Sequence, residues 1–190
     1  MTGFTSDRER RLWGWTVAVV AAVYASAGFA GTLAGVLRRR GLLEASFALA
    51  FLCVVVAVVG SAMRRRPGGR EVWVALGVTA VFGMVVVRLG VGPEERTHLF
   101  EYGLVGVLVH QALEERRGNG AAVPVPPLLA VGLTAALGWI DEGIQALLPD
   151  RVYDLRDVGV NALAGCMAVA AAMAVGQARR WDASRRGPGR

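Results

Sequence analysis

Lysine is absent from this 190-residue sequence, and all 21 of its basic residues are arginine. Cysteine is scarce as well, since Cys53 and Cys166 are the only two, and both lie in apolar runs. Cysteines in such surroundings are typical of small packing residues, so neither a disulfide nor a metal pair is expected. The sequence also lacks a glycine-rich phosphate loop, a dinucleotide-binding fingerprint and a serine elbow, which argues against common nucleotide-binding and serine-hydrolase sites.

Charged residues are few and bunched. They make up 19% of the chain against 54% hydrophobic residues, and the stretches between the bunches have almost none. A soluble domain carries charge over its surface, whereas apolar runs separated by charged loops are typical of membrane spans. The net charge of +6 places basic loops against anionic lipid, and no basic patch with interleaved aromatics indicates a nucleic-acid partner. We therefore predict an all-α protein, a polytopic transmembrane bundle of about six helices in one membrane domain, residues 1–190.

Six apolar runs define the predicted spans, which are residues 12–37, 45–63, 72–91, 97–113, 125–148 and 158–178. The first run is too long for the core of a signal peptide, so we expect a retained helix. The arginine-rich tail after the last span is expected to be disordered. With a cytoplasmic N-terminus, the inner loops carry about twice as many arginines as the outer ones, which favours both termini in the cytoplasm. The triplet Arg38–Arg40 falls on the predicted outer side and argues against this orientation.

Three of the predicted spans each carry a stripe of polar residues at the same expected depth in the membrane. Within each stripe, spacings of three, four or seven residues put most of the side chains on one face of a helix. Under the predicted topology the stripes lie at the outer ends of the last three spans, so the simplest packing turns them toward one another. The stripes are His98, Glu101 and Tyr102; Asp141, Glu142 and Gln145; and Asp154, Asp157 and Asn161.

The energetics of Asp141 and Glu142 argue that this placement is not accidental. Both have apolar neighbours on either side, and an ionised carboxylate near the bilayer centre costs about 2.5–3.5 kcal/mol even on a lenient scale. Both must therefore face a partner, a bound ion or a hydrated cavity. One alternative is that Arg88, Arg96 and Arg151 pair with the acidic residues and only lock the bundle. Because the acidic residues outnumber these arginines, we favour a ligand site and expect one cleft open to the outer side.

Two motifs between residues 96 and 165 carry a resemblance to a known family. The first consists of Arg96, His98, Glu101 and Tyr102, and the second of Asp141, Glu142, Gln145, Pro149, Arg151, Asp154, Asp157, Asn161 and Gly165. This pattern resembles the signature of the VanZ-like family. The resemblance implies a small integral protein of the bacterial cytoplasmic membrane with four to six helices. The family's founder is associated with low-level resistance to the glycopeptide teicoplanin, so the resemblance also implies an action at the cell envelope and an effect on glycopeptide susceptibility. No settled biochemical activity comes with the family.

The leading hypothesis is a site that binds an anionic envelope lipid or a lipid-linked cell-wall precursor. Arg96 and Arg151 would hold phosphate or carboxylate groups of this ligand through forked hydrogen bonds. The remaining residues of the predicted binding set are Tyr102, Asp141, Gln145, Asp154 and Asn161.

A second hypothesis is a membrane transferase or hydrolase acting on a lipid-linked substrate. A histidine beside carboxylates can serve as general acid or base, and the candidate catalytic residues are His98, Glu101, Glu142 and Asp157. No serine or cysteine nucleophile lies beside the histidine. A third hypothesis is an ion-coupled transporter, because intramembrane acids mark proton pathways, although no internal repeat supports it. The same side chains include possible metal ligands, but no local ligand pair supports a metal site; none is predicted, and the cofactor is unknown.

Overall fold

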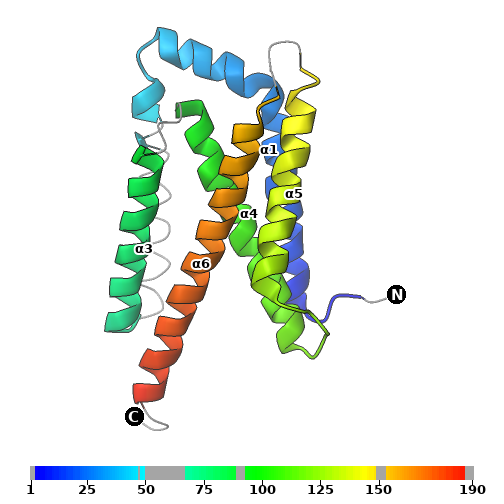
Figure 1. Ribbon diagram of the computed structural model, residues 1–190, viewed down its shortest axis with the longest axis vertical. Helices are drawn as coiled ribbons and strands as arrows, with labels where there is room; N and C mark the ends of the chain where they lie inside the picture. Colours follow the sequence, from blue (N-terminus) through cyan, green and yellow to red (C-terminus); the bar gives the residue numbers. More distant parts are fainter. Residues whose placement is uncertain (1–2, 47, 50–66, 89–92, 149–152, 187–190) are drawn as a thin grey trace. The chain divides into compact units, whose positions relative to one another are not determined.

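The computed structural model describes residues 3–46, 48–49, 67–88, 93–148 and 153–186. Within these ranges the protein is helical and contains no strand, so the predicted all-α fold class is confirmed. The main helices are labelled in Figure 1: α1 (Asp7–Arg39), α3 (Gly69–Arg88), α4 (Pro93–Gly118), α5 (Pro126–Gln145) and α6 (Leu155–Arg186).

Several helices are longer than the apolar runs that predict them. In α1, α4 and α6 the helix continues through the charged residues that flank the run, where side chains three residues apart pair along the surface. Arg117 pairs with Glu114 in this way, and Arg180 donates hydrogen bonds to Gln177. The expectation of a disordered tail after residue 178 is therefore wrong as far as Arg186. The predicted span 45–63 lies almost entirely outside the described residues, as does the end of the span 72–91.

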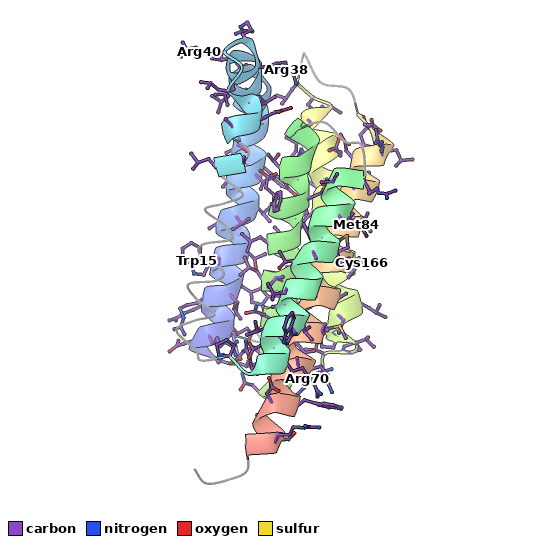
Figure 2. All side chains as sticks on the ribbon, turned by 90° about the vertical axis from the view of Figure 1, so that its left-hand side faces the viewer. Trp15, Arg38, Arg40, Arg70, Met84 and Cys166 are labelled. Atoms are coloured by element: carbon purple, nitrogen blue, oxygen red, sulfur yellow. The ribbon has the colours of Figure 1, made fainter. Side chains whose placement is uncertain are left out.

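Two helices of the described chain are long and apolar enough to cross a membrane, namely Pro126–Gln145 and Leu155–Arg185. This finding is the part of the membrane prediction that the structure supports; six crossings are not confirmed. Large apolar side chains are also exposed on the helices, including Trp15 at 64% and Leu128 at 69%. Figure 2 shows Trp15 projecting away from α1. Apolar exposure on this scale is typical of a surface that contacts something other than water.

The chain divides into two compact units, each of which is described by itself. The first unit comprises Met1–Gly31 and Glu94–Ala170, and the second comprises Thr32–Pro93 and Ala171–Arg190. The prediction of a single membrane domain over residues 1–190 stays a prediction.

In the first unit, α4, α5 and the first half of α6 approach one another closely at small residues. A methyl group added to Gly106 would lie 3.1 Å from Gly165 Cα, and one added to Gly165 would lie 2.7 Å from Thr134 Cγ2. Glycine at these positions therefore lets the helix backbones come together, as is common in membrane bundles. An apolar core continues beside this contact and consists of Val105, Val109, Leu113, Ala130 and Val169.

The start of α1 is held against the end of α4 by a network around Glu9. One oxygen of Glu9 accepts hydrogen bonds from the backbone N–H and the hydroxyl of Thr5, and the other accepts one from Arg116 at 2.8 Å. The carboxylate is enclosed by these partners near the helix ends rather than deep within the unit. Burial opposes ionisation of Glu9, but the hydrogen bonds from Thr5 and Arg116 outweigh it and lower the pKa of the carboxyl. Glu9 is therefore a fully partnered anion.

A second carboxylate in the same network is equally well partnered. Glu115 accepts hydrogen bonds from Ser6 at 2.9 Å and from Arg8 at 2.7 Å, and Asn119 also donates to it. The hydrogen bond from Ser6, followed by those from Asn119 and Arg8, lowers the pKa of Glu115. Ser6 also accepts a hydrogen bond from the Glu9 N–H, as a cap at the start of α1 does. These contacts make α1 and α4 antiparallel neighbours.

In the second unit, the start of α3 is tied to the end of α6. The Asp182 carboxylate accepts a hydrogen bond from the Glu71 N–H at 3.2 Å and so caps the N-terminus of α3 from another helix. The Glu71 carboxylate in turn accepts hydrogen bonds from Arg179, and the Arg70 guanidinium lies 4.4 Å from the Trp181 ring centre. These contacts account for the helical order of the arginine-rich segment.

Candidate functional site

The buried face of α5 carries the middle stripe of the site. Two prolines fix its start at Pro126, one residue from the predicted boundary, and the preceding Val125 has φ of 38°, in the left-handed region. Residues of α5 that recur every three or four positions are buried: Ala130, Thr134, Gly138, Asp141, Glu142 and Gln145. The helical period thus turns the predicted polar residues of α5 inward, against α4 and α6.

His98 of α4 lies between two carboxylates. Its Nδ1 atom is 3.6 Å from Glu101 Oε2 on the same helix and 3.7 Å from Asp141 Oδ2 on α5. Both distances are slightly longer than a hydrogen bond. The Asp141 side chain is fully buried, whereas those of His98 and Glu101 retain 15% and 33% exposure. Exposure therefore decreases from the Glu101 carboxyl group, through the His98 imidazole, to the buried Asp141 carboxyl group.

Two tyrosines contact the backbone of α5 next to these residues. Tyr24 of α1 donates a hydrogen bond to the Leu137 carbonyl oxygen at 2.8 Å, and Tyr102 of α4 donates to the same oxygen at 3.4 Å. Both hydroxyls lie close enough to Asp141 to interact with it electrostatically, and the Tyr102 ring stacks on His98. Tyr24 was not among the predicted site residues, because it stands in an apolar run with other hydroxyl residues and no spacing relates it to the polar stripes.

Asn161 of α6 supplies the third helix of the site. Its side chain is fully buried and lies against Gly138, where an added methyl group would be 2.7 Å from Asn161 Cβ. Gly138 precedes Asp141 by one helical turn on the buried face of α5. The structure thus places His98 beside Asp141, and Asn161 beside Gly138.

Several polar atoms in this cluster are buried without a hydrogen-bond partner among the described residues. They are Nδ1 of His98, both carboxylate oxygens of Asp141, and both polar side-chain atoms of Asn161. The nearby Glu142 and Asp157 each interact with another residue. His110 also has such an atom, but it lies about three turns further along α4. Buried polar atoms in folded proteins are nearly always paired, so this concentration requires a partner.

Other predicted site residues have different surroundings. Asp154 is exposed and accepts a hydrogen bond from the Arg156 N–H at 2.7 Å, so it caps the start of α6. Gln145 is buried on the same face of α5 as Asp141. The side chain of Arg96 and the whole of Arg151 lie outside the described residues, so their predicted role as anion ligands stays a prediction.

The cluster is more closed than predicted. A single open cleft was expected, but Asp141, Glu142 and Asn161 each retain no more than 2% exposure. The reason is the close approach of the helices at glycine, which brings α6 over the polar face of α5. Within the described part of the chain, no group of three or more His, Cys, Asp or Glu residues is arranged to hold a metal ion. The chemistry that the cluster offers is hydrogen bonding and proton exchange.

Family models, curated proteins and solved structures offer no match to this chain. The resemblance to the VanZ-like family therefore rests on its two sequence motifs alone and stays a prediction.

Proposed function

We propose that the protein is a VanZ-like, multi-pass protein of the bacterial cytoplasmic membrane whose polar cluster binds the headgroup of an anionic envelope lipid or lipid-linked cell-wall precursor. The observation that carries this proposal is the set of buried polar atoms on His98, Asp141 and Asn161 for which the described part of the chain supplies no hydrogen-bond partner. Leaving such groups without a partner costs about 1–3 kcal/mol each, so a ligand or ordered water that supplies the missing hydrogen bonds is favoured.

The membrane setting is supported by the outward-facing surface. Trp73, Val87 and Leu147 are more than 70% exposed, and α5 and α6 have the length and hydropathy of membrane spans. The exposed Trp139 donates a hydrogen bond to the Tyr153 hydroxyl at 3.0 Å, and such amphipathic aromatic pairs suit the boundary between lipid and water. That boundary would place Glu101 and His98 near headgroup level. We keep both termini in the cytoplasm as part of the proposal.

A contrast within the first unit argues for a ligand rather than a structural lock. Both oxygens of Glu9 are hydrogen-bonded to Thr5 or Arg116, as expected of a carboxylate that fastens helices. Asp141 is also buried, yet His98 and the Tyr102 hydroxyl, which lie near its carboxyl group, make no well-formed hydrogen bond to its oxygens. A carboxylate that only stabilises the fold is expected to have its hydrogen bonds supplied by the protein, as Glu9 does. A carboxylate that binds a ligand is expected to keep acceptor sites for that ligand, as Asp141 does.

Arg96 has a defined part in the proposal. It precedes His98 by two residues in the first turn of α4, so a phosphate bound there would lie beside the exposed end of the cluster. Forked hydrogen bonds from arginine to phosphate are strong and directional. We propose that Arg96, with Arg151, holds the charged part of the headgroup.

The test is lipid retention by the purified full-length protein. Native mass spectrometry of protein extracted from a bacterial membrane is expected to show bound anionic lipid, with at least about tenfold less on Asp141→Asn, since charge-assisted hydrogen bonds contribute about 1.5–3 kcal/mol. Glu114→Gln, which removes an exposed carboxylate at the other end of α4, is the matched control and should retain lipid. Equal lipid loading of all three proteins contradicts a site at Asp141. The Asp141→Asn protein should unfold at the same denaturant concentration as the native one or a higher one.

The position of His98 favours catalysis as a second candidate function. A neutral imidazole between two carboxylates can take a proton from a substrate hydroxyl and be stabilised once charged. Incubation with a labelled lipid-linked precursor separates the two functions: conversion that is lost in His98→Ala and retained in Glu114→Gln indicates an enzyme. Recovery of the unmodified lipid from a protein that retains it indicates a binding protein.

A further inference from the structure

We infer that the closed part of this site binds hydroxyl groups of the ligand, so that the headgroup carries a polyol or a sugar. The inference deepens the proposed lipid-binding function and rests on it. It starts from the buried atoms of Asp141 and Asn161 that have no hydrogen-bond partner among the described residues.

The hydrogen-bonding types of these atoms restrict the chemistry of the ligand. The carboxyl oxygens of Asp141 accept hydrogen bonds, whereas the Asn161 amide both accepts through Oδ1 and donates through Nδ2. An ammonium group only donates and leaves the amide N–H₂ without a partner. A phosphate or carboxylate only accepts hydrogen bonds and leaves the Asp141 oxygens without a donor. A hydroxyl both donates and accepts, so neighbouring hydroxyls satisfy both side chains.

The side chains around the cluster already supply part of what Asp141 needs, but not all of it. The Tyr102 hydroxyl is close to this carboxylate, and its 3.4 Å hydrogen bond to the Leu137 carbonyl is weak enough to exchange. One hydroxyl satisfies one of about four acceptor sites on a carboxylate. His98 Nδ1 lies 3.7 Å away, too far for a hydrogen bond in this arrangement. Neither Tyr102 nor His98 forms a hydrogen bond with Asn161. The Asn161 amide therefore still requires a donor for its Oδ1 atom and an acceptor for its Nδ2 atom.

The exposure gradient gives the direction of entry. Glu101 and His98 are the partly exposed members of the cluster, whereas Asp141 and Asn161 are closed. A headgroup that enters past Glu101 would bring its outermost hydroxyls to the closed end. Its phosphate would remain near the start of α4, where the proposed function places Arg96. The order along the ligand is therefore lipid, phosphate, hydroxyl-bearing group.

The experiment compares two lipids that differ only in hydroxyl groups. Dioleoyl phosphatidylglycerol and dioleoyl phosphatidylpropanol have the same chains, the same charge and a three-carbon headgroup, but only the first has hydroxyls on that headgroup. Binding of each to the full-length native protein is measured by native mass spectrometry in an amine-oxide detergent, because a maltoside detergent would itself supply sugar hydroxyls. We expect phosphatidylglycerol to bind at least about tenfold more tightly.

Variants then locate the preference. Asn161→Leu keeps the branching and the number of heavy atoms of the side chain but removes its polar atoms, and should bring the two affinities to within about twofold of each other. The matched control is Asn119→Leu, since Asn119 is an exposed asparagine in the network at the far end of α4, and it should keep the preference. Free glycerol is added as a competitor: displacement of phosphatidylglycerol by glycerol, but not by propanol, supports hydroxyl recognition without the lipid anchor.

The outcomes separate this inference from the proposed function. Equal affinity of the native protein for the two lipids, with loss of both in Asp141→Asn, overturns hydroxyl recognition and leaves lipid binding in place. Failure of the native protein to bind either lipid overturns both. Because the comparison of the two lipids uses the native protein, it decides the inference even if Asn161→Leu does not fold.

Discussion

Replacement of Gly138 by alanine tests the helix contact on which the site depends. The added methyl group would lie 2.7 Å from Asn161 Cβ and 3.2 Å from its Nδ2 atom. The nearer contact involves a carbon fixed to the α6 backbone, so rotation of a side chain cannot relieve it. Alanine should gain about 0.5–1 kcal/mol over glycine in a helix, but overpacking of this kind typically costs about 1–3 kcal/mol. We expect a net loss of up to about 2 kcal/mol.

The control is Gly143→Ala on the same helix. A methyl group at Gly143 meets no atom within 4 Å, so only the helix-propensity gain applies. The two variants should therefore differ by about 1–3 kcal/mol in the free energy of unfolding, measured by circular dichroism during denaturant unfolding in detergent micelles. Asn161→Gly removes the opposing Cβ, so it should recover part of the loss when combined with Gly138→Ala. Identical unfolding of Gly138→Ala and Gly143→Ala would show that α5 and α6 do not meet here.

Three further predictions concern the helix ends. The pKa of Glu9 in the folded state lies below 4.5, so the ionised carboxylate stabilises the fold above that pH, and this stabilisation is lost as the pH falls through the lower folded-state pKa. Acid unfolding of Glu9→Gln should lack this pH-dependent loss. At neutral pH the variant should be about 1–3 kcal/mol less stable than the native protein. A methyl group at Gly68 would overlap the Asp182 carboxylate, so Gly68→Ala should speed amide exchange at the start of α3, whereas Gly69→Ala, with nothing within 4 Å, should not. Val125 holds a left-handed φ, so Val125→Gly should raise the thermal midpoint by relieving strain of about 1–2 kcal/mol; a lowered midpoint contradicts that backbone geometry.

The helices and the polar stripes could be predicted from the sequence because both follow from short-range spacing. Residues three and four apart share a helix face whatever the rest of the chain does, which is why Asp141 and Gln145 were placed together correctly. The network around Glu9 could not be predicted in the same way. Its partner Arg116 is 107 residues away, and no short-range spacing relates the two residues.

The burial of Asp141, Glu142 and Asn161 could not be predicted from the sequence, and the reason is physical. A polar stripe predicts that its residues face something polar, but it does not set how near the opposite helix lies. That distance depends on glycine, because Gly106, Gly138 and Gly165 let the three helices approach closely. Asn161 packs directly against Gly138. Small-residue spacing in these helices was not used to predict how closely they pack. Glycines facing one another across helices were therefore the overlooked signal.

The closed site changes what a ligand must do. An open cleft binds whatever headgroup diffuses to it, and its carboxylates stay hydrated when it is empty. Asp141 and Asn161 are buried, so an entering group has to supply a hydrogen-bond partner for each of their polar atoms. Bulk water cannot replace a hydrogen bond that the group does not make. Under the proposed function, selectivity would follow from the donor and acceptor pattern rather than from net charge. A ligand that lacks one hydroxyl would leave a buried group unpaired and lose roughly tenfold or more in affinity. Burial of these polar groups costs free energy while no ligand is bound, and the same burial would make the occupied cluster selective among ligands.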